Sequence, residues 1–359
     1  MSLEAHLKAP QAKGHVSVAQ IRDHWYVACL SSELGKKPLA RVIAGVPLVV
    51  FRTQGGQPGA LLDRCPHRNV PLSVGEVAGE RLRCGYHGWE FDVGGTCRLI
   101  PGLCSEPEGK GRRVESYAAR EQDGLVWVYL TEGVTPSKEP FALPLAREAA
   151  YTTVWREVQA ESSVHAAIEN ALDVPHTAFL HKGFFRGVGE PHEIEVVVRR
   201  EADRVEAEYV GEPRPEGLAG KLMSPSGGVV THFDRFVLPS IAQVEYRIGE
   251  ENHILVTTMC TPVSDFFTRL YAVISLRLRI PGFLVKPILT PLALKIFSQD
   301  AEILKLQTET IQTFGGEQFV STELDVLGPH IWRLMRQAER GESPEVEGVL
   351  VEKRFKMKV

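Results

Sequence analysis

The pattern that most constrains this chain is a pair of short segments that each carry one cysteine and one histidine. The first segment is Cys65-Pro-His67, and the second is Cys84-Gly-Tyr-His87. Two thiols and two imidazoles at these spacings are typical of a metal site that is shared between two loops. We therefore expect both segments to lie at one point of the fold.

Two kinds of metal site accept such a ligand set. Zn²⁺ binds two thiolates and two imidazoles tetrahedrally, but zinc knuckles usually bring two cysteines together as Cys-x-x-Cys. In a Rieske [2Fe–2S] cluster two thiolates hold one iron and two imidazoles hold the other, so each loop supplies one ligand of each kind. The spacing therefore favours a Rieske cluster on Cys65, His67, Cys84 and His87 over a zinc site.

The residues around this pattern predict a small antiparallel β domain. From Trp25 to about Thr131, short apolar or alternating runs are separated by glycine-rich turns. A proline-bearing stretch at 135–144 follows and reads as a linker. Beyond it, long strand patterns and two helical patterns predict a larger sheet that carries helices. The expected fold class is α+β, with domains at 20–134 and 135–359.

Composition narrows the functional classes. The chain has 359 residues, enough for two cores, and a formal net charge of −4, which argues against nucleic acid as a partner. Six cysteines are too few for a disulfide scaffold, and the first residues lack the apolar core of a secretory signal. No run of about 18 apolar residues is present. We expect a cytoplasmic protein.

A second group of metal-binding residue types follows in the segment 169–181. It contains Asn170, Asp173, His176 and His181. Asp173 and His176 are three residues apart and would share a helical face. His176 and His181 are five apart, so both reach one metal only if the helix is distorted by a π-type turn or ends near His181. Pro175 supplies a reason for such a distortion.

Two histidines and one carboxylate make the facial triad of non-haem Fe(II) oxygenases, so a carboxylate is still required. We choose Asp300, which lies in a helical pattern that starts near residue 298 and stops at Gly315-Gly316. A different reading makes Asp300 an acidic residue in the first turn of that helix, where the helix dipole favours it. Glu302 and Glu309 are chemical rivals, but they fall on the more polar side of the helix.

The two groups together resemble the α-subunits of Rieske non-haem iron oxygenases, the ring-hydroxylating and oxidatively demethylating family. The likeness extends from Trp25 through Gln307. It implies a Rieske domain followed by a helix-grip catalytic domain, which is a curved antiparallel sheet with helices. It also implies that His176, His181 and Asp300 hold a mononuclear iron.

The resemblance also assigns roles to the two polar residues that precede these histidines. Asp173 would bridge His176 and the cluster ligand His87, so that it orients both rings and offers a short electron path. Asn170, one turn before Asp173, would support this bridge or the surroundings of the iron.

The same resemblance implies partners and a reaction class. Electrons would pass between neighbouring subunits of a head-to-tail homotrimer. A separate ferredoxin or reductase would draw them from NAD(P)H, since no nucleotide-binding glycine fingerprint follows a strand in this chain. O₂ would be the co-substrate of a monooxygenation that ends in hydroxylation or demethylation. A pure electron carrier with an empty second site is a further reading.

Residues 265–297 are the part of the sequence that bears on the substrate class. This segment is rich in apolar residues and holds one acidic and five basic side chains: Asp265, Arg269, Arg277, Arg279, Lys286 and Lys295. Prolines at 281, 287 and 291 should break any continuous helix. A basic and apolar segment of this kind can lie on the inner surface of a membrane, or it can form an apolar entrance through which a substrate reaches the iron. We therefore expect a bulky sterol, terpenoid or polycyclic substrate, with a small aromatic acid as the alternative.

Overall fold

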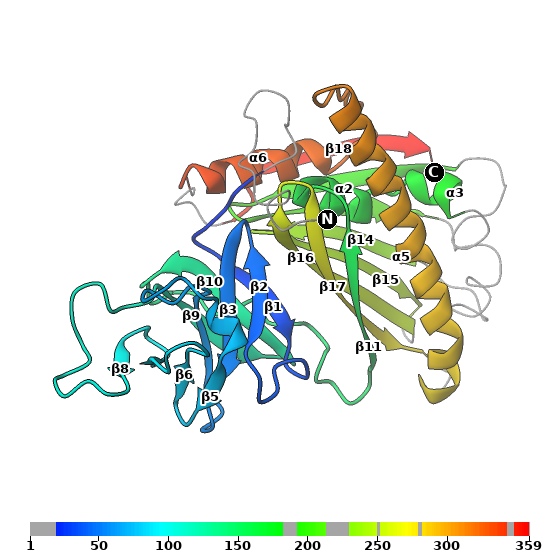
Figure 1. The fold of residues 1–359 in the computed structure, drawn as a ribbon. Coiled ribbons are helices and arrows are strands. Elements are labelled where there is room, and N and C mark those ends of the chain that lie inside the picture. The colour runs from blue at the N-terminus through cyan, green and yellow to red at the C-terminus, as the bar shows by residue number, and fades with distance from the viewer. Residues whose placement is uncertain are drawn as a thin grey trace. The chain divides into compact units, whose positions relative to one another are not determined.

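Antiparallel strands form the first of two units into which the chain divides (Figure 1). The computed structural model describes residues 19–181, 192–212, 230–249, 252–278, 282–342 and 348–358. The first unit is Ile21–Ala142, and the second is built mainly from Leu143–Val359. The sequence-based boundary lies eight residues earlier, at the start of the proline-bearing stretch 135–144.

The first unit contains a six-stranded sheet with the strand order β1-β10-β9-β4-β3-β2. Its strands are β1 (Trp25–Leu30), β2 (Leu39–Ile43), β3 (Val46–Arg52), β4 (Pro58–Leu62), β9 (Ser116–Gln122) and β10 (Leu125–Glu132). Ala44 and Gly45 form a two-residue hairpin turn between β2 and β3, and both have positive φ, 45° and 78°. This geometry matches the right-handed twist of the flanking strands.

A smaller four-stranded sheet carries the second cysteine and histidine segment. It consists of β5 (Glu76–Ala78), β6 (Arg81–Arg83), β7 (Glu90–Phe91) and β8 (Cys97–Leu99), and the short helix η1 (Leu72–Val74) precedes it. Phe51, Leu61, Leu72 and Phe91 form part of a buried core that also contains Cys65 and Cys84. The two cysteines thus belong to one apolar core.

The second unit is an eight-stranded antiparallel sheet with the order β11-β17-β16-β15-β14-β13-β12-β18. The strands are β11 (Thr152–Ala160), β12 (Glu193–Arg200), β13 (Arg204–Val210), β14 (Val230–Val237), β15 (Ile241–Ile248), β16 (Asn252–Ser264), β17 (Phe267–Arg277) and β18 (Val351–Lys358). Strict alternation of buried and half-buried residues along β14 leaves one of its faces buried. The α+β fold class is confirmed.

In the described part of the second unit, four helices accompany this sheet: α2 (Val164–Leu172), α3 (His176–Leu180), α5 (Gly282–Thr313) and α6 (Gly328–Glu339). Helix α2 packs against β14, β15, β16 and β17, α5 packs against β11, and α6 against β13. Ser163 caps α2, because its hydroxyl oxygen accepts the Ala166 N–H at 3.2 Å. Gly315, with φ of 74°, ends α5 where the sequence predicts a stop.

Helix α5 differs from the sequence-based prediction, which had prolines breaking any helix before residue 298. It runs unbroken from Gly282 and contains Pro287 and Pro291. The two prolines are four residues apart and both exposed, so they share one solvent-facing side, where water can hydrate the carbonyls that lose their helical partners. Asp300 consequently lies deep within the helix, which rules out the first-turn reading.

The basic and apolar segment 265–297 is divided between two elements rather than forming one surface. Arg269 and Arg277 lie on β17, where Arg269 pairs with Glu157 at 3.5 Å and Arg277 stacks over Tyr151. Arg279 and Pro281, as well as the side chain of Lys286, lie outside the described residues. Within the described part of the chain, no helix combines the length and apolar character that crossing a membrane requires.

Candidate metal centres

The two cysteine and histidine segments form loops of the same backbone shape. In the first loop the Cys65 N–H donates to Val70 O at 2.9 Å, and the Asn69 N–H returns to Cys65 O at 2.9 Å. In the second, the Cys84 N–H donates to Trp89 O at 2.8 Å and the Gly88 N–H to Cys84 O at 3.1 Å. The two loops therefore share a backbone frame around the cysteine, and the histidine follows two residues later in the first loop and three residues later in the second.

A left-handed residue at the same position completes each loop. Asn69 has a φ of 60° and Gly88 a φ of 69°, and each stands four residues after its cysteine. Asparagine and glycine adopt this conformation with the least strain. The conformation turns each loop back on its cysteine.

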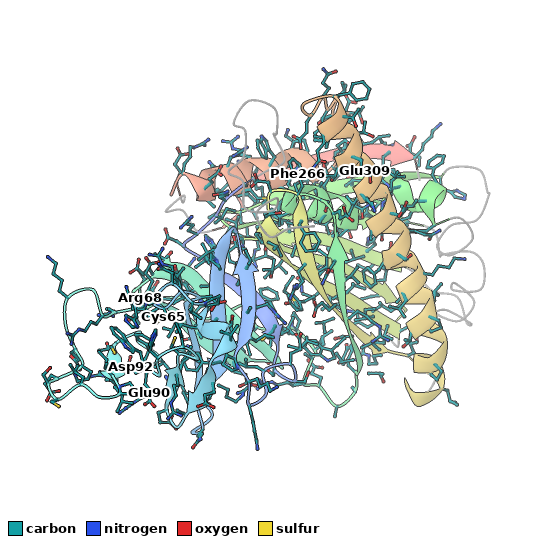
Figure 2. All side chains as sticks on the ribbon, in the orientation of Figure 1. Cys65, Arg68, Glu90, Asp92, Phe266 and Glu309 are labelled. Atoms are coloured by element: carbon teal, nitrogen blue, oxygen red, sulfur yellow. The ribbon has the colours of Figure 1, made fainter. Side chains whose placement is uncertain are left out.

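The four ligand side chains come together within this unit, in which Figure 2 labels Cys65. The rings of His67 and His87 have centroids 4.4 Å apart. The Trp89 ring stacks on His67 at 4.8 Å with an interplanar angle of 6°, so it covers one face of that imidazole. The thiols of Cys65 and Cys84 are close enough to hydrogen bond to each other.

A close backbone approach holds the second loop in place. Gly75 ends η1, and a Cβ at this position would stand 2.0 Å from the Arg83 carbonyl oxygen. A Cβ on Gly85 would likewise stand 3.0 Å from Val74 O. Only glycine therefore lets the chain after η1 lie against the residues on either side of Cys84.

The donor set fits a Rieske [2Fe–2S] cluster. His67 Nδ1 is buried and has no hydrogen-bond partner among the described residues. Burial and the neighbouring His87 lower the pKa of His67, which keeps this nitrogen neutral and able to bind a metal. Burial raises the pKa of the Cys65 thiol to about 11, a tendency that metal ligation overcomes by deprotonating the sulfur.

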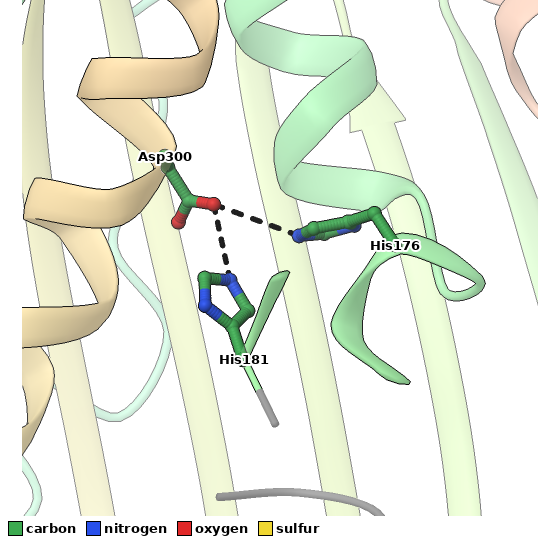
Figure 3. A group of neighbouring side chains, drawn as sticks. All are labelled: His176, His181 and Asp300. Carbon is green, nitrogen blue, oxygen red and sulfur yellow. Dashed lines mark ion pairs between the residues drawn. The ribbon is translucent and has the colours of Figure 1, made fainter. Parts of the chain in front are cut away.

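The second predicted centre is formed by His176, His181 and Asp300, which the fold brings together from α3 and α5 (Figure 3). One ligand atom from each of the three lies within 4.8 Å of the others. Asp300 Oδ1 is 3.0 Å from His181 Nε2 and 3.6 Å from His176 Nε2. Two imidazoles and one carboxylate that converge in this way are the ligand set of a mononuclear non-haem iron.

The Nδ1 nitrogens of His176 and His181, which point away from Asp300, form hydrogen bonds. His176 Nδ1–H donates to the Asp173 carbonyl oxygen, and the Asp173 carboxylate is 3.6 Å from the same nitrogen. His181 Nδ1–H donates to Gln299 Oε1 at 3.1 Å. Because each Nδ1 carries the hydrogen, each Nε2 keeps its lone pair for a metal. Gln299 was missed in the sequence, although it stands next to Asp300.

The charges of the three ligand residues shift one another's pKa values. Burial opposes the charged form of His176, but the carboxylates of Asp173 and Asp300 raise its pKa to about 9. Burial raises the pKa of Asp300, whereas hydrogen bonds from His176 and His181 lower it below its usual value. A cation at the centre of the three replaces the proton that they otherwise share.

The local backbone differs from the expected single helix. Helix α2 ends at Leu172, the next residue Asp173 is extended with a ψ of 104°, and α3 begins at His176. Val174 precedes Pro175, which disfavours helical geometry at that point. Asp173 and His176 therefore do not share a helical face as predicted. His181 follows the end of α3, which is how two histidines five residues apart reach one point.

The remaining predicted residues lie around this centre. Asn170 accepts the Asp173 N–H at 3.4 Å through its main-chain oxygen. Its side chain lines a groove of about 1170 Å³, together with Asp173, Glu169 and Trp332. Glu309, labelled on α5 in Figure 2, and Glu302 are both exposed and belong to no metal-binding group.

A buried charged cluster was not identified from the sequence. His232 on β14 is 1% exposed, and its two ring nitrogens lie 2.5 Å from Glu212 Oε2 and 3.0 Å from Asp234 Oδ1. The rings of Tyr209 and Tyr246 stack on its two faces. Alternation along β14 places His232 and Asp234 on one face, which was the available signal.

Comparisons with known proteins agree with both centres. A model of the Rieske [2Fe–2S] domain matches residues 24–118, and a model of the vanillate O-demethylase oxygenase C-terminal domain matches residues 160–341. The chain is 27% identical over 363 residues to the vanillate O-demethylase oxygenase subunit of a Pseudomonas species, covering 92% of this chain and 98% of that protein.

A second relative matches over a shorter region. The oxygenase component of dicamba O-demethylase from Stenotrophomonas maltophilia is 36% identical over 170 residues, which span 45% of this chain and 48% of that protein, about half of each. The crystal structure of dicamba monooxygenase bound to dicamba superposes with a TM-score of 0.77 at 23% identity, covering 90% of this chain and 99% of that one. This structural likeness shows a shared fold.

Proposed function

The chain belongs to the Rieske non-haem iron oxygenase family and carries the C-terminal domain of the vanillate O-demethylase oxygenases. From this premise we propose that it uses O₂ and externally supplied electrons to demethylate or hydroxylate a small aromatic substrate. The observation that carries the proposal is the convergence of His176 Nε2, His181 Nε2 and Asp300 Oδ1. An electron carrier would have no use for this second centre.

The two domains would have different roles, one in electron transfer and the other in oxygen activation. Residues 20–134 would hold the [2Fe–2S] cluster on Cys65, His67, Cys84 and His87, and residues 135–359 would hold the iron. Bound there, the cluster supplies single electrons and the iron activates O₂. In a demethylation, an aryl methyl ether, O₂, two electrons and two protons give a phenol, formaldehyde and water.

This chain's own residues orient the iron ligands and connect the centres. Gln299 and the Asp173 carbonyl fix the tautomers of His181 and His176. The Asp173 side chain is 36% exposed, so its carboxylate can also receive a hydrogen bond from outside the unit. His87, which is exposed at the tip of its loop, is the proposed donor, supplied by a neighbouring copy in a homotrimer.

Charge supports this pairing of copies. The groove at Asp173 is lined by the acidic residues Glu169 and Asp325. The cluster loops expose Arg68 and His87, and Tyr86 beside them is 61% exposed. Opposite charge and an exposed aromatic ring favour the docking of one surface on the other. A separate ferredoxin or reductase then delivers electrons from NAD(P)H.

The variant Asp173→Ala tests the electron path. Both metal centres should stay loaded, with about three irons per chain, because no ligand is removed. Reduction of the cluster by a surrogate reductase should be normal, while product formation falls by a factor of 100 or more, roughly the loss of one essential step. Product formation at the wild-type rate would contradict the bridge.

The choice of a small substrate departs from the sequence-based expectation of a bulky lipid. That expectation depended on one continuous basic and apolar surface at 265–297, and the structure divides this segment between β17 and α5. The names of the two relatives refer to vanillate and dicamba, which are single-ring methoxybenzoic acids. The alternative of a small aromatic acid is therefore the better supported reading.

A substrate panel tests the proposed function. Purified holoprotein, a surrogate reductase and NAD(P)H are incubated with methoxybenzoates, other methylated aromatics and sterols, and formaldehyde and hydroxylated products are measured with and without O₂. We expect O₂-dependent product from single-ring aromatics and none from His176→Ala, a variant that keeps the cluster. Product from sterols alone would overturn the proposed substrate class.

A further inference from the structure

One face of the catalytic sheet carries an apolar row that the helices do not fully cover. Val154, Ile274, Val256 and Val244 lie directly opposite one another on β11, β17, β16 and β15. We call these four residues the floor. The last three are half-buried although they lie in the middle of the sheet, so space remains above them.

The iron ligands stand on the helices that cover this same face. Ala160, on the same side of β11 as Val154, packs with Leu304 of α5 and with Ala166 of α2. Helix α5 carries Asp300 one turn before Leu304, and α2 leads into the two histidines. In Figure 3 the strands pass behind the three ligands. A substrate between helices and floor would therefore lie next to the iron ligands.

Arg156 lies at the edge of the floor, two residues after Val154 on β11 and on the same face. Its Nε is buried and has no hydrogen-bond partner among the described residues. Its Nη1–H donates to the Trp155 carbonyl oxygen at 2.6 Å. The residues across from it in the same row, Ala272, Thr258 and Ala242, have short side chains and are buried.

Several other arginines of this sheet have carboxylate partners. Arg269 pairs with Glu157 at 3.5 Å, Arg235 with Glu245 at 2.5 Å and Arg199 with Glu208 at 2.9 Å. For Arg156 no ion pair is found in the part of the chain that the structure describes. A partly buried cation without a counter-ion is costly, which indicates that an anion is supplied from outside the chain.

The opposite end of the floor has the opposite charge. Asp234 is the neighbour of Val244 on β14, and with Glu212 it places two carboxylates on the single imidazole of His232. An anionic substrate group is repelled there and attracted to Arg156. Between the two ends, Val154 to Val244 spans three inter-strand spacings, about 14 Å, which accommodates a substituted aromatic ring.

Resting on the function proposed above, we propose that Arg156 binds the carboxylate of an aromatic acid substrate through a two-pronged ion pair. The ring then lies on the floor, and the group to be oxidised is turned toward the iron ligands. Arginine suits this role because its planar fork matches both carboxylate oxygens. Arg156 is thus a specificity-determining residue, and the substrate class is a single-ring aromatic acid.

The test compares binding of matched acids and amides. Methoxybenzoate and methoxybenzamide are titrated calorimetrically into the iron-loaded wild type, Arg156→Gln and Arg156→Lys. The control is Arg269→Gln, which removes an arginine from the opposite face of the neighbouring strand. Cluster absorbance and iron content verify that each variant is folded.

We expect the wild type to bind the acid at least 10-fold more tightly than the amide, as charge-assisted hydrogen bonds predict. Arg156→Gln should weaken acid binding about 10- to 100-fold and leave the amide within about 2-fold, while Arg156→Lys falls between. In turnover, the loss should appear in KM rather than kcat.

Equal binding of acid and amide by the wild type, or unchanged acid binding by Arg156→Gln, would overturn the role of Arg156. Because binding is measured without turnover, it decides this role independently of the proposed reaction. Failure of the proposed function would show instead as no O₂-dependent product from any single-ring aromatic. An aromatic sulfonate that replaces the carboxylate at equal affinity would contradict selectivity for the acid.

Discussion

The two metal centres of this protein are built in different ways. The cluster site is made of two loops of the same backbone shape, 65–70 and 84–89, each closed by its own hydrogen bonds. The iron site joins two residues at the ends of α3 to Asp300, which stands more than a hundred residues later on α5. The first site is local in sequence, whereas the second exists only when the whole catalytic unit is folded.

Removal of one ligand from each centre should give the largest and most separable effects. Cys84→Ser should lose the cluster and its visible absorbance yet keep the mononuclear iron, while Asp300→Ala should do the reverse. Product formation should fall at least about 1000-fold in both, because each centre performs an essential step. Iron content and cluster absorbance measured on the same samples check this.

If Asp300→Ala also lost the cluster, the two centres would not be the independent sites described above. His330→Ala, which alters a histidine of α6 outside the ligand group His176, His181 and Asp300, serves as a matched control for His176→Ala.

Glycine at position 75 should matter for the cluster site alone. An alanine Cβ would meet the Arg83 carbonyl at 2.0 Å, and neither backbone segment can move without displacing Cys84. Gly75→Ala should destabilise the first unit by about 3 kcal/mol or more, in the range of severe overpacking. Gly35→Ala is the control, since a Cβ there meets nothing within 4 Å.

Thermal unfolding followed by cluster absorbance measures this difference. Equal midpoints for Gly75→Ala and Gly35→Ala would show that the close approach after η1 does not hold the second loop in place.

The residues proposed as cluster ligands could all be chosen from their spacing in the sequence, whereas those proposed for the iron site could be chosen only in part. Cys65, His67, Cys84 and His87 are recognisable because their spacing alone encodes the loops. Asp300 was chosen by residue type, by family resemblance and because Glu302 and Glu309 fall on the more polar side of the predicted helix.

Two features could not be predicted in this way: the residues that hydrogen bond to the metal ligands, and the continuity of helix α5 through its prolines. Gln299 acts through a contact with His181 that arises only in three dimensions. Helix α5 was predicted to break at its prolines because local propensity gives no information on which side of a helix faces water.

The catalytic unit should also show a pH dependence that arises from His232. Burial lowers the pKa of this imidazole, but Asp234 and Glu212 raise it more, to about 9. Because the folded pKa lies above the ordinary value of about 6.5, its contribution to stability is present below pH 6.5 and is lost as the pH rises through 9. Fully expressed, the loss is on the order of 3 kcal/mol.

Urea unfolding of the wild type and of His232→Gln between pH 6 and 9.5 measures this contribution. The wild type should lose stability more steeply than the variant. Parallel curves would mean that the imidazole carries no proton in the folded state.

Gln299 gives a smaller effect that is confined to the iron site. Gln299→Leu removes the acceptor for His181 Nδ1–H, so the imidazole can take the wrong tautomer or rotate. Iron affinity should fall about 10- to 100-fold, as is typical when a partner of a metal-binding histidine is lost. Gln299→Glu keeps an acceptor oxygen and should retain most of the affinity. Fe(II) titration against a chelator separates the two.

The smallest effect is expected for a substitution of Glu309. It distinguishes a carboxylate that binds the iron, as proposed for Asp300, from one that lies on the same helix without binding it. Glu309 is exposed on α5 nine residues beyond Asp300, which places it two and a half turns further along and away from His176 and His181. Glu309→Gln should therefore keep about three irons per chain and change stability by less than about 0.5 kcal/mol. Loss of the mononuclear iron in this variant would move the third ligand from Asp300 to Glu309.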